Sequence, residues 1–226
     1  MTRRSITSLA LALTAALSLG ACGNVNQEGA EALRNLPKTL LAKKEPPKPL
    51  TLQEIATAVS STTASVFMFE YENLGAQFLL QDIEQNGPYH TYGNPTRQVV
   101  VLRDGMITAT RGFGGDLMSS EEDGLFSLVR SRTTGRTSYD QRFLTPENLT
   151  IVRRYSCYVS PGGSVPVVSD VLQVTGSSME AVCTGVNKDS PDFTNTYTVS
   201  GDGYILGARQ WLGPTIGYFV SQALRR

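Results

Sequence analysis

Apolar and polar residues alternate in short runs along most of the chain after residue 65, and turn residues separate the runs. Alternation of this kind predicts β-strands with one buried face. The pair Asp104-Gly105 is the strongest hairpin signal, because both residues tolerate the positive φ of a two-residue turn. The runs predict roughly ten strands, at 66–72, 77–85, 89–92, 98–103, 106–111, 150–160, 165–175, 180–186, 193–199 and 204–212.

Helical patterning is confined to three segments. Thr51, followed three residues later by Glu54, forms a capping box that predicts a short helix after it. Helical spacing also occurs over 116–130, where Asp116 is the expected N-cap, and over 215–224. The three acids at 121–123 are expected to form the solvated start of the middle helix.

Short hairpin turns, rather than helical crossovers, join the predicted strands. Glycine-rich segments at 161–163 and 176–178 predict turns inside a meander that spans 150–186. Strands joined by such turns pair antiparallel, and a sheet of this size bends or curls. The sequence therefore predicts a mainly β fold, either a strongly bent antiparallel sheet or an open barrel, with a few short helices.

The N-terminal 21 residues have the pattern of an export signal. Arginines at positions 3 and 4 precede an apolar run that is shorter than the roughly 20 residues of a membrane span. The run ends in Leu-Gly-Ala-Cys, which resembles the lipobox of bacterial lipoproteins. We expect acylation of Cys22 with chains such as palmitate; ordinary cleavage after Ala21 is the alternative. Gly23, where inner-membrane lipoproteins carry Asp, indicates the outer membrane.

The residues that follow differ in composition from the rest of the chain. The segment 22–50 is polar and ends in a run rich in proline and lysine. Proline-rich segments form extended, semi-rigid spacers. The expected organisation is a signal peptide over 1–21, a lipidated tether over 22–50 and a single β domain over 51–226.

Charge and composition exclude several functional classes. The 226 residues include 20 Lys+Arg, 20 Asp+Glu and one His. Balanced charge argues against a nucleic-acid partner, and a single His argues against a metal site or a His-dependent mechanism. No cofactor is expected.

Two cysteines remain beside Cys22. An oxidising compartment favours a disulfide between Cys157 and Cys183, and two buried free thiols are the alternative. The predicted meander places the two in non-consecutive strands, so the bond would join strands that are not neighbours or staple the sheet across its bend.

Two segments carry most of the candidate chemistry. The glycine-rich run from Arg111 to Asp116 lacks the βαβ context of a nucleotide loop, and an ion pair between these two residues is expected to fix its turn. The strand 204–212 ends in a guanidinium, an amide and an indole. We expect both segments to form one surface that binds a polar polymer; the alternative is a structural role for both. Its candidate residues are Arg111, Asp116, Asn195, Tyr197, Arg209, Gln210 and Trp211. Alternation places Asn195 and Tyr197 on one face of their strand, where we expect them to face Arg209 or Trp211 across the hairpin.

Several segments together resemble the YjbF family, the lipoproteins of group four capsule and exopolysaccharide operons. The resemblance covers roughly residues 51–226 of the printed sequence and includes the lipobox. Phe113 stands where the family pattern has Leu, and Gly115 is at a variable position. The matching features are Cys22, the run 110–118, Cys157 with Cys183, 195–197, Arg209-Gln210-Trp211, Pro214 and Gly217.

The resemblance implies a lipoprotein on the periplasmic face of the outer membrane, with a bent β fold and no catalytic residues to carry over. The expected function is that of a non-enzymatic accessory of capsule or exopolysaccharide secretion, which binds glycan or an export protein. One alternative is a polysaccharide-modifying hydrolase that uses carboxylates such as Asp116 and Glu121. A weaker alternative is a lipid-handling cavity inside the sheet.

Overall fold

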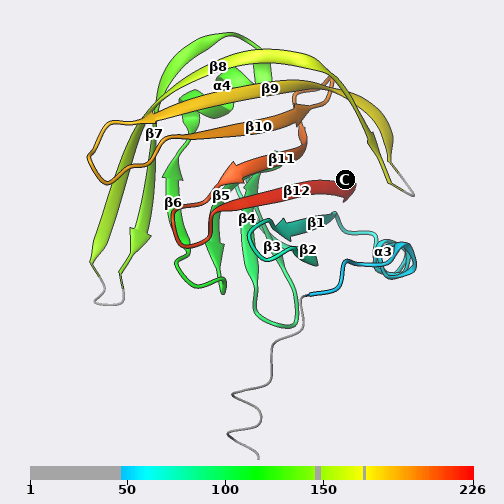
Figure 1. The fold of residues 1–226 in the computed structure, drawn as a ribbon. Coiled ribbons are helices and arrows are strands. Elements are labelled where there is room, and N and C mark those ends of the chain that lie inside the picture. The colour runs from blue at the N-terminus through cyan, green and yellow to red at the C-terminus, as the bar shows by residue number, and fades with distance from the viewer. Residues whose placement is uncertain (1–46, 146–148, 170–171) are drawn as a thin grey trace, which may run out of the picture. The chain divides into compact units, whose positions relative to one another are not determined.

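The computed structural model describes residues 47–145, 149–169 and 172–226. The expected signal peptide, Cys22 and most of the expected tether lie outside these residues. The described residues contain one antiparallel sheet of 12 strands and two helices (Figure 1). The predicted mainly β fold is confirmed.

The sheet closes almost completely into a barrel. Every strand pairs with its neighbours in the chain except β5 and β6, which do not pair with each other, and the first strand, β1, pairs with the last, β12. The strand order is β5-β4-β3-β2-β1-β12-β11-β10-β9-β8-β7-β6, so the two edges belong to consecutive strands. The strands are β1 (Val66–Tyr71), β2 (Ala76–Asn86), β3 (Tyr89–Gly93), β4 (Val99–Arg103), β5 (Met106–Arg111), β6 (Leu117–Glu121), β7 (Gly135–Leu144), β8 (Thr150–Val168), β9 (Gln173–Gly185), β10 (Phe193–Val199), β11 (Ile205–Trp211) and β12 (Tyr218–Arg225).

Side chains bridge the seam between β5 and β6, which share no backbone ladder in the described sheet. The Thr110 hydroxyl accepts a hydrogen bond from the Leu117 N–H at 3.0 Å. Farther along, the Ser120 hydroxyl donates to the Thr108 carbonyl at 3.3 Å. Polar side chains therefore satisfy part of the backbone that a closed sheet would pair.

A buried amide supports the edge strand β5 from inside the barrel. Gln210, on β11, is fully buried. Its Nε2 donates to the Ile107 carbonyl at 3.2 Å, and its Oε1 accepts from the Ile107 N–H at 2.8 Å. The side chain of Gln210 thus takes the place of a neighbouring strand at this residue.

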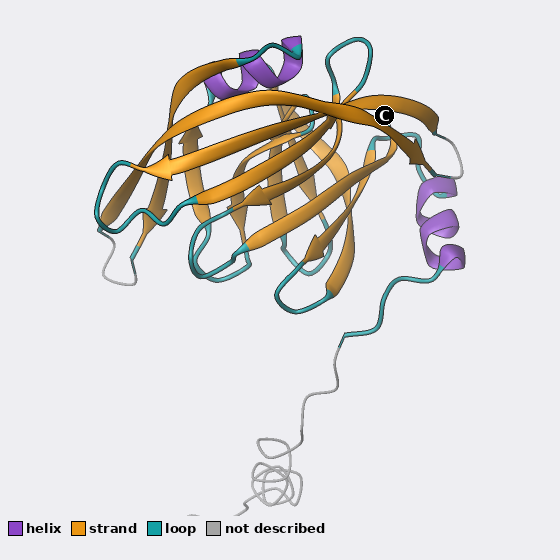
Figure 2. Cartoon of the chain, turned by 45° about the horizontal axis from the view of Figure 1, so that its top comes forward, coloured by secondary structure: helices purple, strands orange, loops and turns teal. Residues whose placement is uncertain are grey.

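Two apolar clusters fill the interior of the sheet. One lies under β7–β11 and includes helix α4 (Asp123–Ser131), which contributes Leu125 and Val129. The other lies under β1–β5 and β12 around stacked aromatic rings such as Phe67 and Phe69. Figure 2 shows the two helices against the curved sheet. The concave side is therefore occupied by side chains, which gives no support to the lipid-handling alternative.

Helix α3 (Leu52–Ser60) begins where the capping box predicts. The Thr51 hydroxyl accepts from the Glu54 N–H at 3.2 Å, and the Glu54 carboxylate accepts from the Thr51 N–H at 2.7 Å. Val59 of this helix packs with Val66 and Leu224. The helix is thereby fixed to the neighbouring strands β1 and β12.

The other two helix predictions are corrected. Residues 117–121 form β6, and α4 begins only at Asp123, with Glu122 in place of Asp116 at the N-cap position. The segment 215–224 is mostly strand β12, because pairing with β1 and β11 overrides a short helical spacing. Glu122 is buried rather than solvated: it accepts from Arg103 at 3.2 Å and from Tyr89 at 3.2 Å.

The predicted turn at 161–163 is a β-bulge inside one long strand. Pro161 pairs with Met179 and Ser164 with Ser177, so β8 contains one extra residue between these pairs. The segment 176–178 accordingly stays within β9.

The disulfide joins neighbouring strands, which corrects the predicted placement. Cys157 on β8 and Cys183 on β9 are direct cross-strand partners, with a Cα–Cα distance of 4.0 Å. Both are fully buried. The bond therefore reinforces one pair of strands and does not span the bend of the sheet.

Candidate functional site

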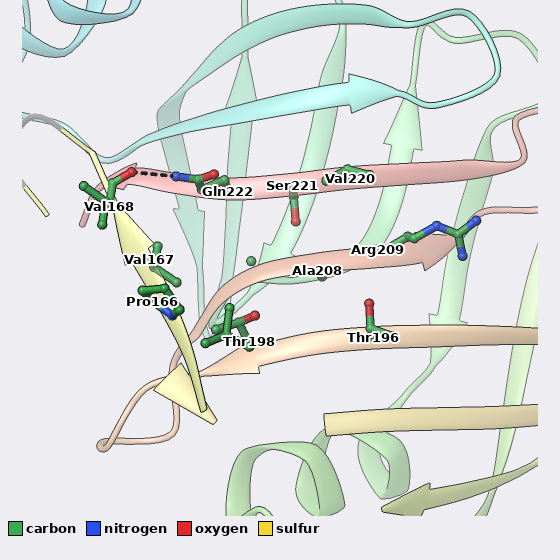
Figure 3. A pocket seen from close by; sticks show the side chains of 12 residues that line it. Pro166, Val167, Val168, Thr196, Thr198, Ala208, Arg209, Val220, Ser221 and Gln222 are labelled. Atoms are coloured by element: carbon green, nitrogen blue, oxygen red, sulfur yellow. Dashed lines mark hydrogen bonds between the residues drawn. The ribbon is translucent and has the colours of Figure 1, made fainter. Parts of the chain in front are cut away.

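A groove lies on the outer face of β10, β11 and β12 (Figure 3). Its volume is about 510 Å³. One wall is the end of β8, residues 165–168, which reaches β12: the Gln222 Nε2 donates to the Val168 carbonyl at 3.1 Å, and the Ser169 hydroxyl donates to the Leu224 carbonyl at 2.8 Å. We call this cavity the outer groove.

The two walls of the outer groove differ in chemistry. The end of β8 contributes the aliphatic side chains of Val165, Pro166, Val167 and Val168. The strands opposite contribute hydroxyl, amide and guanidinium groups from Thr196, Thr198, Gln222 and Arg209 (Figure 3). These polar groups include both hydrogen-bond donors and acceptors. Thr198 and Gln222 lie beside the aliphatic end of β8, whereas the Arg209 guanidinium points away from it, toward the other end of the groove (Figure 3).

Strand register explains why these polar side chains share the outer face. Thr196 is paired with Arg209, and Thr198 with Gly207. Gly207 is in turn paired with Gln222 on β12. Directly paired residues point to the same side of a sheet, so the four side chains share the face around Gly207, which itself adds no bulk.

Arg209 is held in a fixed position at one end of the outer groove. Its Nε and Nη2 donate to the two carboxylate oxygens of Glu72 at 2.9 and 2.8 Å. Its guanidinium carbon lies 3.3 Å from the centre of the Tyr218 ring. The hydrogen bonds to Glu72 raise the pKa of Arg209 above its ordinary value. Because the two side chains are 37% and 38% exposed, the pair contributes only about 0–1 kcal/mol to stability.

Trp211 is part of an aromatic cluster next to Arg209. Its ring meets Tyr218 edge-on at 5.2 Å and stacks on Phe193 at 6.2 Å. The indole N–H is buried and has no hydrogen-bond partner within the described residues. Trp211 is therefore half-buried and packs against other aromatic rings, so the structure favours the structural alternative for this residue.

The predicted ion pair between Arg111 and Asp116 is wrong. Arg111 donates to the Thr110 carbonyl at 2.8 Å and to the Leu117 carbonyl at 3.4 Å. Asp116 instead closes the loop, because Gly112, at φ +89°, turns backbone N–H groups toward it. The donors to Asp116 are the Thr110 hydroxyl (3.1 Å), the Gly112 N–H (2.9 Å) and the Phe113 N–H (3.1 Å).

The glycine-rich loop and the end of β11 lie at the same end of the barrel. A Cβ on Gly115 would stand 2.5 Å from the Cβ of Thr215, in the loop that follows β11. Tyr71 donates to the Thr215 carbonyl at 3.2 Å. The pKa of Tyr71 is raised mainly by burial and, to a lesser extent, by the negative charge of Asp116. The two segments thus meet through the loop that follows β11.

Three of the candidate binding residues belong to the core. Asn195, Tyr197 and Gln210 are fully buried. Asn195 accepts from the backbone N–H of Trp211 at 2.8 Å and donates to the Tyr197 hydroxyl at 3.0 Å. Burial raises the pKa of Tyr197. The predicted shared face of Asn195 and Tyr197 is real, but it is the inner face.

Sequence reasoning missed Thr196, Thr198, Gln222 and the end of β8 as lining of the outer groove. The alternation that groups Asn195 with Tyr197 also places the two threonines together on the opposite face. That signal was in the sequence. The contribution of β8 was not, because it depends on the bulge and on contacts with β12.

The carboxylates named for a hydrolase both have structural partners. Asp116 accepts three hydrogen bonds within its loop, and Glu121, which is 64% exposed, pairs with Arg142 at 2.9 Å. In the described part of the chain no group of three or more His, Cys, Asp and Glu residues could hold a metal ion. Neither described helix is long and apolar enough to cross a membrane.

Comparisons with known proteins agree with this fold. Residues 39–224 match the model of a family described as "Group 4 capsule polysaccharide lipoprotein gfcB, YjbF". The crystal structure of the hypothetical lipoprotein YmcC from Escherichia coli (K12) matches with a TM-score of 0.65 and 13% sequence identity, over 90% of this chain and 98% of that chain. At this identity the match concerns the fold alone. No curated protein matches the chain.

Proposed function

This chain belongs to the YjbF family of group 4 capsule polysaccharide lipoproteins, and from this we propose that its barrel binds the polysaccharide in the outer groove. In this proposal the protein is a non-enzymatic accessory of secretion, anchored through Cys22 to the periplasmic face of the outer membrane. The groove holds the glycan without breaking or forming bonds in it.

The chemistry of the outer groove is the observation that carries this proposal. A polysaccharide presents hydroxyl groups, which both donate and accept, beside apolar C–H faces. Thr196, Thr198 and Arg209 match the hydroxyl groups, and the aliphatic end of β8 matches the C–H faces. The groove volume of about 510 Å³ lies within the range of small-molecule sites.

Arg209→Ala is expected to weaken binding of the purified full-length protein to the polysaccharide about tenfold or more, because a hydrogen bond from a charged donor is lost. The matched control is Glu72→Gln, which weakens the same ion pair but leaves the guanidinium at the groove. The measurement is a binding titration in detergent, together with the amount of polymer that cells secrete.

The threonines provide a second, isosteric test of the same groove. Thr198→Val keeps the shape of the wall and removes one hydroxyl, and Thr184→Val makes the same change on the exposed outer face of β9. The proposal is supported if Thr198→Val and Arg209→Ala weaken binding while the controls Thr184→Val and Glu72→Gln do not. Unchanged titrations in both, with secretion still lost, would assign the groove to an export protein instead of the glycan.

The proposed anchor is tested separately. Cys22→Ser is expected to move the protein from the membrane fraction to the soluble periplasmic fraction, because the acyl chains are absent, while the fold stays intact. Cell fractionation and intact-protein mass spectrometry check this result. A wild-type protein whose mass lacks lipid, or a variant that remains membrane-bound, would show that another feature provides the attachment.

A further inference from the structure

A second cavity opens at the other end of the barrel, where β5 begins. Its volume is about 360 Å³. The outer groove and this cavity have no lining residue in common. We call it the mouth pocket; its chemically active lining residues are Asp82, His90, Tyr92, Asp104, Tyr204 and Arg226.

The mouth pocket is closed toward the barrel interior. Tyr92 and Leu102 line it and are almost fully buried. Behind them, the rings of Phe67 and Tyr92 pack edge-on at 5.2 Å within the apolar cluster. A ligand can therefore enter from outside only, so the pocket suits the end of a polymer and not its middle.

The charged groups of the mouth pocket leave no excess of positive charge. Arg226 pairs with Asp202 at 2.9 Å and lies over the Tyr204 ring at 4.0 Å. This arginine, with further hydrogen bonds, holds the pKa of Asp202 well below its usual range. Asp104 pairs with Arg130 at 2.6 Å. With Asp82, three carboxylates stand against two arginines here, so carboxylates are in excess.

The remaining groups are the Asp82–His90 pair and two phenols. Asp82 Oδ2 lies 2.7 Å from His90 Nδ1, and the two side chains are 20% and 33% exposed. The Tyr92 hydroxyl donates to the Ser65 hydroxyl at 2.9 Å. Burial raises the pKa of Tyr92 and of Tyr204, so both phenols stay neutral. The pocket therefore offers carboxylate acceptors and neutral hydroxyls.

We infer that the mouth pocket binds a single terminal sugar unit that is uncharged or carries an amine. Asp82 and Asp104 each keep acceptor lone pairs beside their protein partners, which can accept from sugar hydroxyls or an ammonium group. The excess of carboxylates over arginines repels an acidic sugar. The volume of about 360 Å³ is near the lower limit of ligand sites. This inference rests on the proposed function in one respect, namely that the ligand is a sugar of the polysaccharide.

The single histidine of the chain makes the test specific. The full-length protein in detergent, labelled with ¹³C-histidine, gives one imidazole signal, from His90. Methyl glucoside and methyl glucosaminide are expected to shift this signal in a saturable way, and methyl glucuronoside is expected not to. Asp104→Asn should weaken the response about tenfold, because one charged acceptor is removed.

Glu121→Gln is the matched control, since it removes an exposed, arginine-paired carboxylate outside the pocket. A signal that no sugar moves, an equal response to the glucuronoside, or an undiminished response in Asp104→Asn overturns the inference. Arg209→Ala should leave the His90 response intact. A failure of the outer groove is thereby distinguishable from a failure of the mouth pocket.

Discussion

Replacing Cys157 and Cys183 together by alanine is expected to lower the free energy of unfolding by about 3–4 kcal/mol, because the bond closes a loop in the unfolded chain. The two residues are 26 positions apart and fully buried between β8 and β9. Alanine is preferable to serine here, since serine would bury two hydroxyls. Urea denaturation of both proteins, in buffer without reductant, measures the difference in the free energy of unfolding.

Val182→Ala is the control for side-chain truncation in the same strand. Val182 neighbours Cys183 but is 43% exposed, so its loss costs well under the change expected for the disulfide. Reduction of the disulfide should bring the free energy of unfolding of the wild-type protein close to that of the double variant. Equal stability of the wild type and the double variant would mean that the bond does not form in the native protein.

Gln210→Met is expected to lower the free energy of unfolding by about 2–4 kcal/mol, because it leaves the buried N–H and carbonyl of Ile107 without their partner. Methionine fills nearly the same volume, so the loss reports hydrogen bonding and not a cavity. Chemical denaturation gives the stability. Faster hydrogen exchange of the Ile107 amide is the local readout.

Gln85→Met is the matched control. Gln85 is exposed and donates to the Gly87 carbonyl in a turn, so its replacement should change stability by less than about 0.5 kcal/mol. A Gln210→Met protein as stable as this control would show that β5 holds its place without the amide. Protection of the Ile107 amide would then come from elsewhere.

Hydrophobic alternation predicted most strands of the sheet, but not β6, β7 or β12. Strand β7 was absent from the prediction, since its buried side chains include Tyr139 and Gln141. Strand β12 was predicted as a helix, because in a segment this short the apolar spacing fits both periods. In both cases, pairing with two neighbouring strands decides the structure.

The candidate site was predicted in part. The sequence located Arg209, which lines the outer groove, and it grouped Asn195 with Tyr197 correctly. The same alternation also indicates which face is buried, because Phe193 and Val199 lie on the face of Asn195 and Tyr197, while threonines occupy the other. The polar groups of Asn195 and Tyr197 led to their assignment to a binding surface instead. Only the three-dimensional structure shows that Asn195 and Gln210 serve backbone groups inside the barrel.

The pairing of β1 with β12 affects how the protein is made. A chain that emerges N-terminus first, from a ribosome or across a membrane, leaves one edge of β1 unpaired until the eight residues of β12 have followed. Pairing between such distant segments also closes the longest loop of the sheet and is slow for that reason. Until then, the open edges of β1 and β11 can pair with other chains. The emerging protein is therefore most prone to aggregation just before β12 follows.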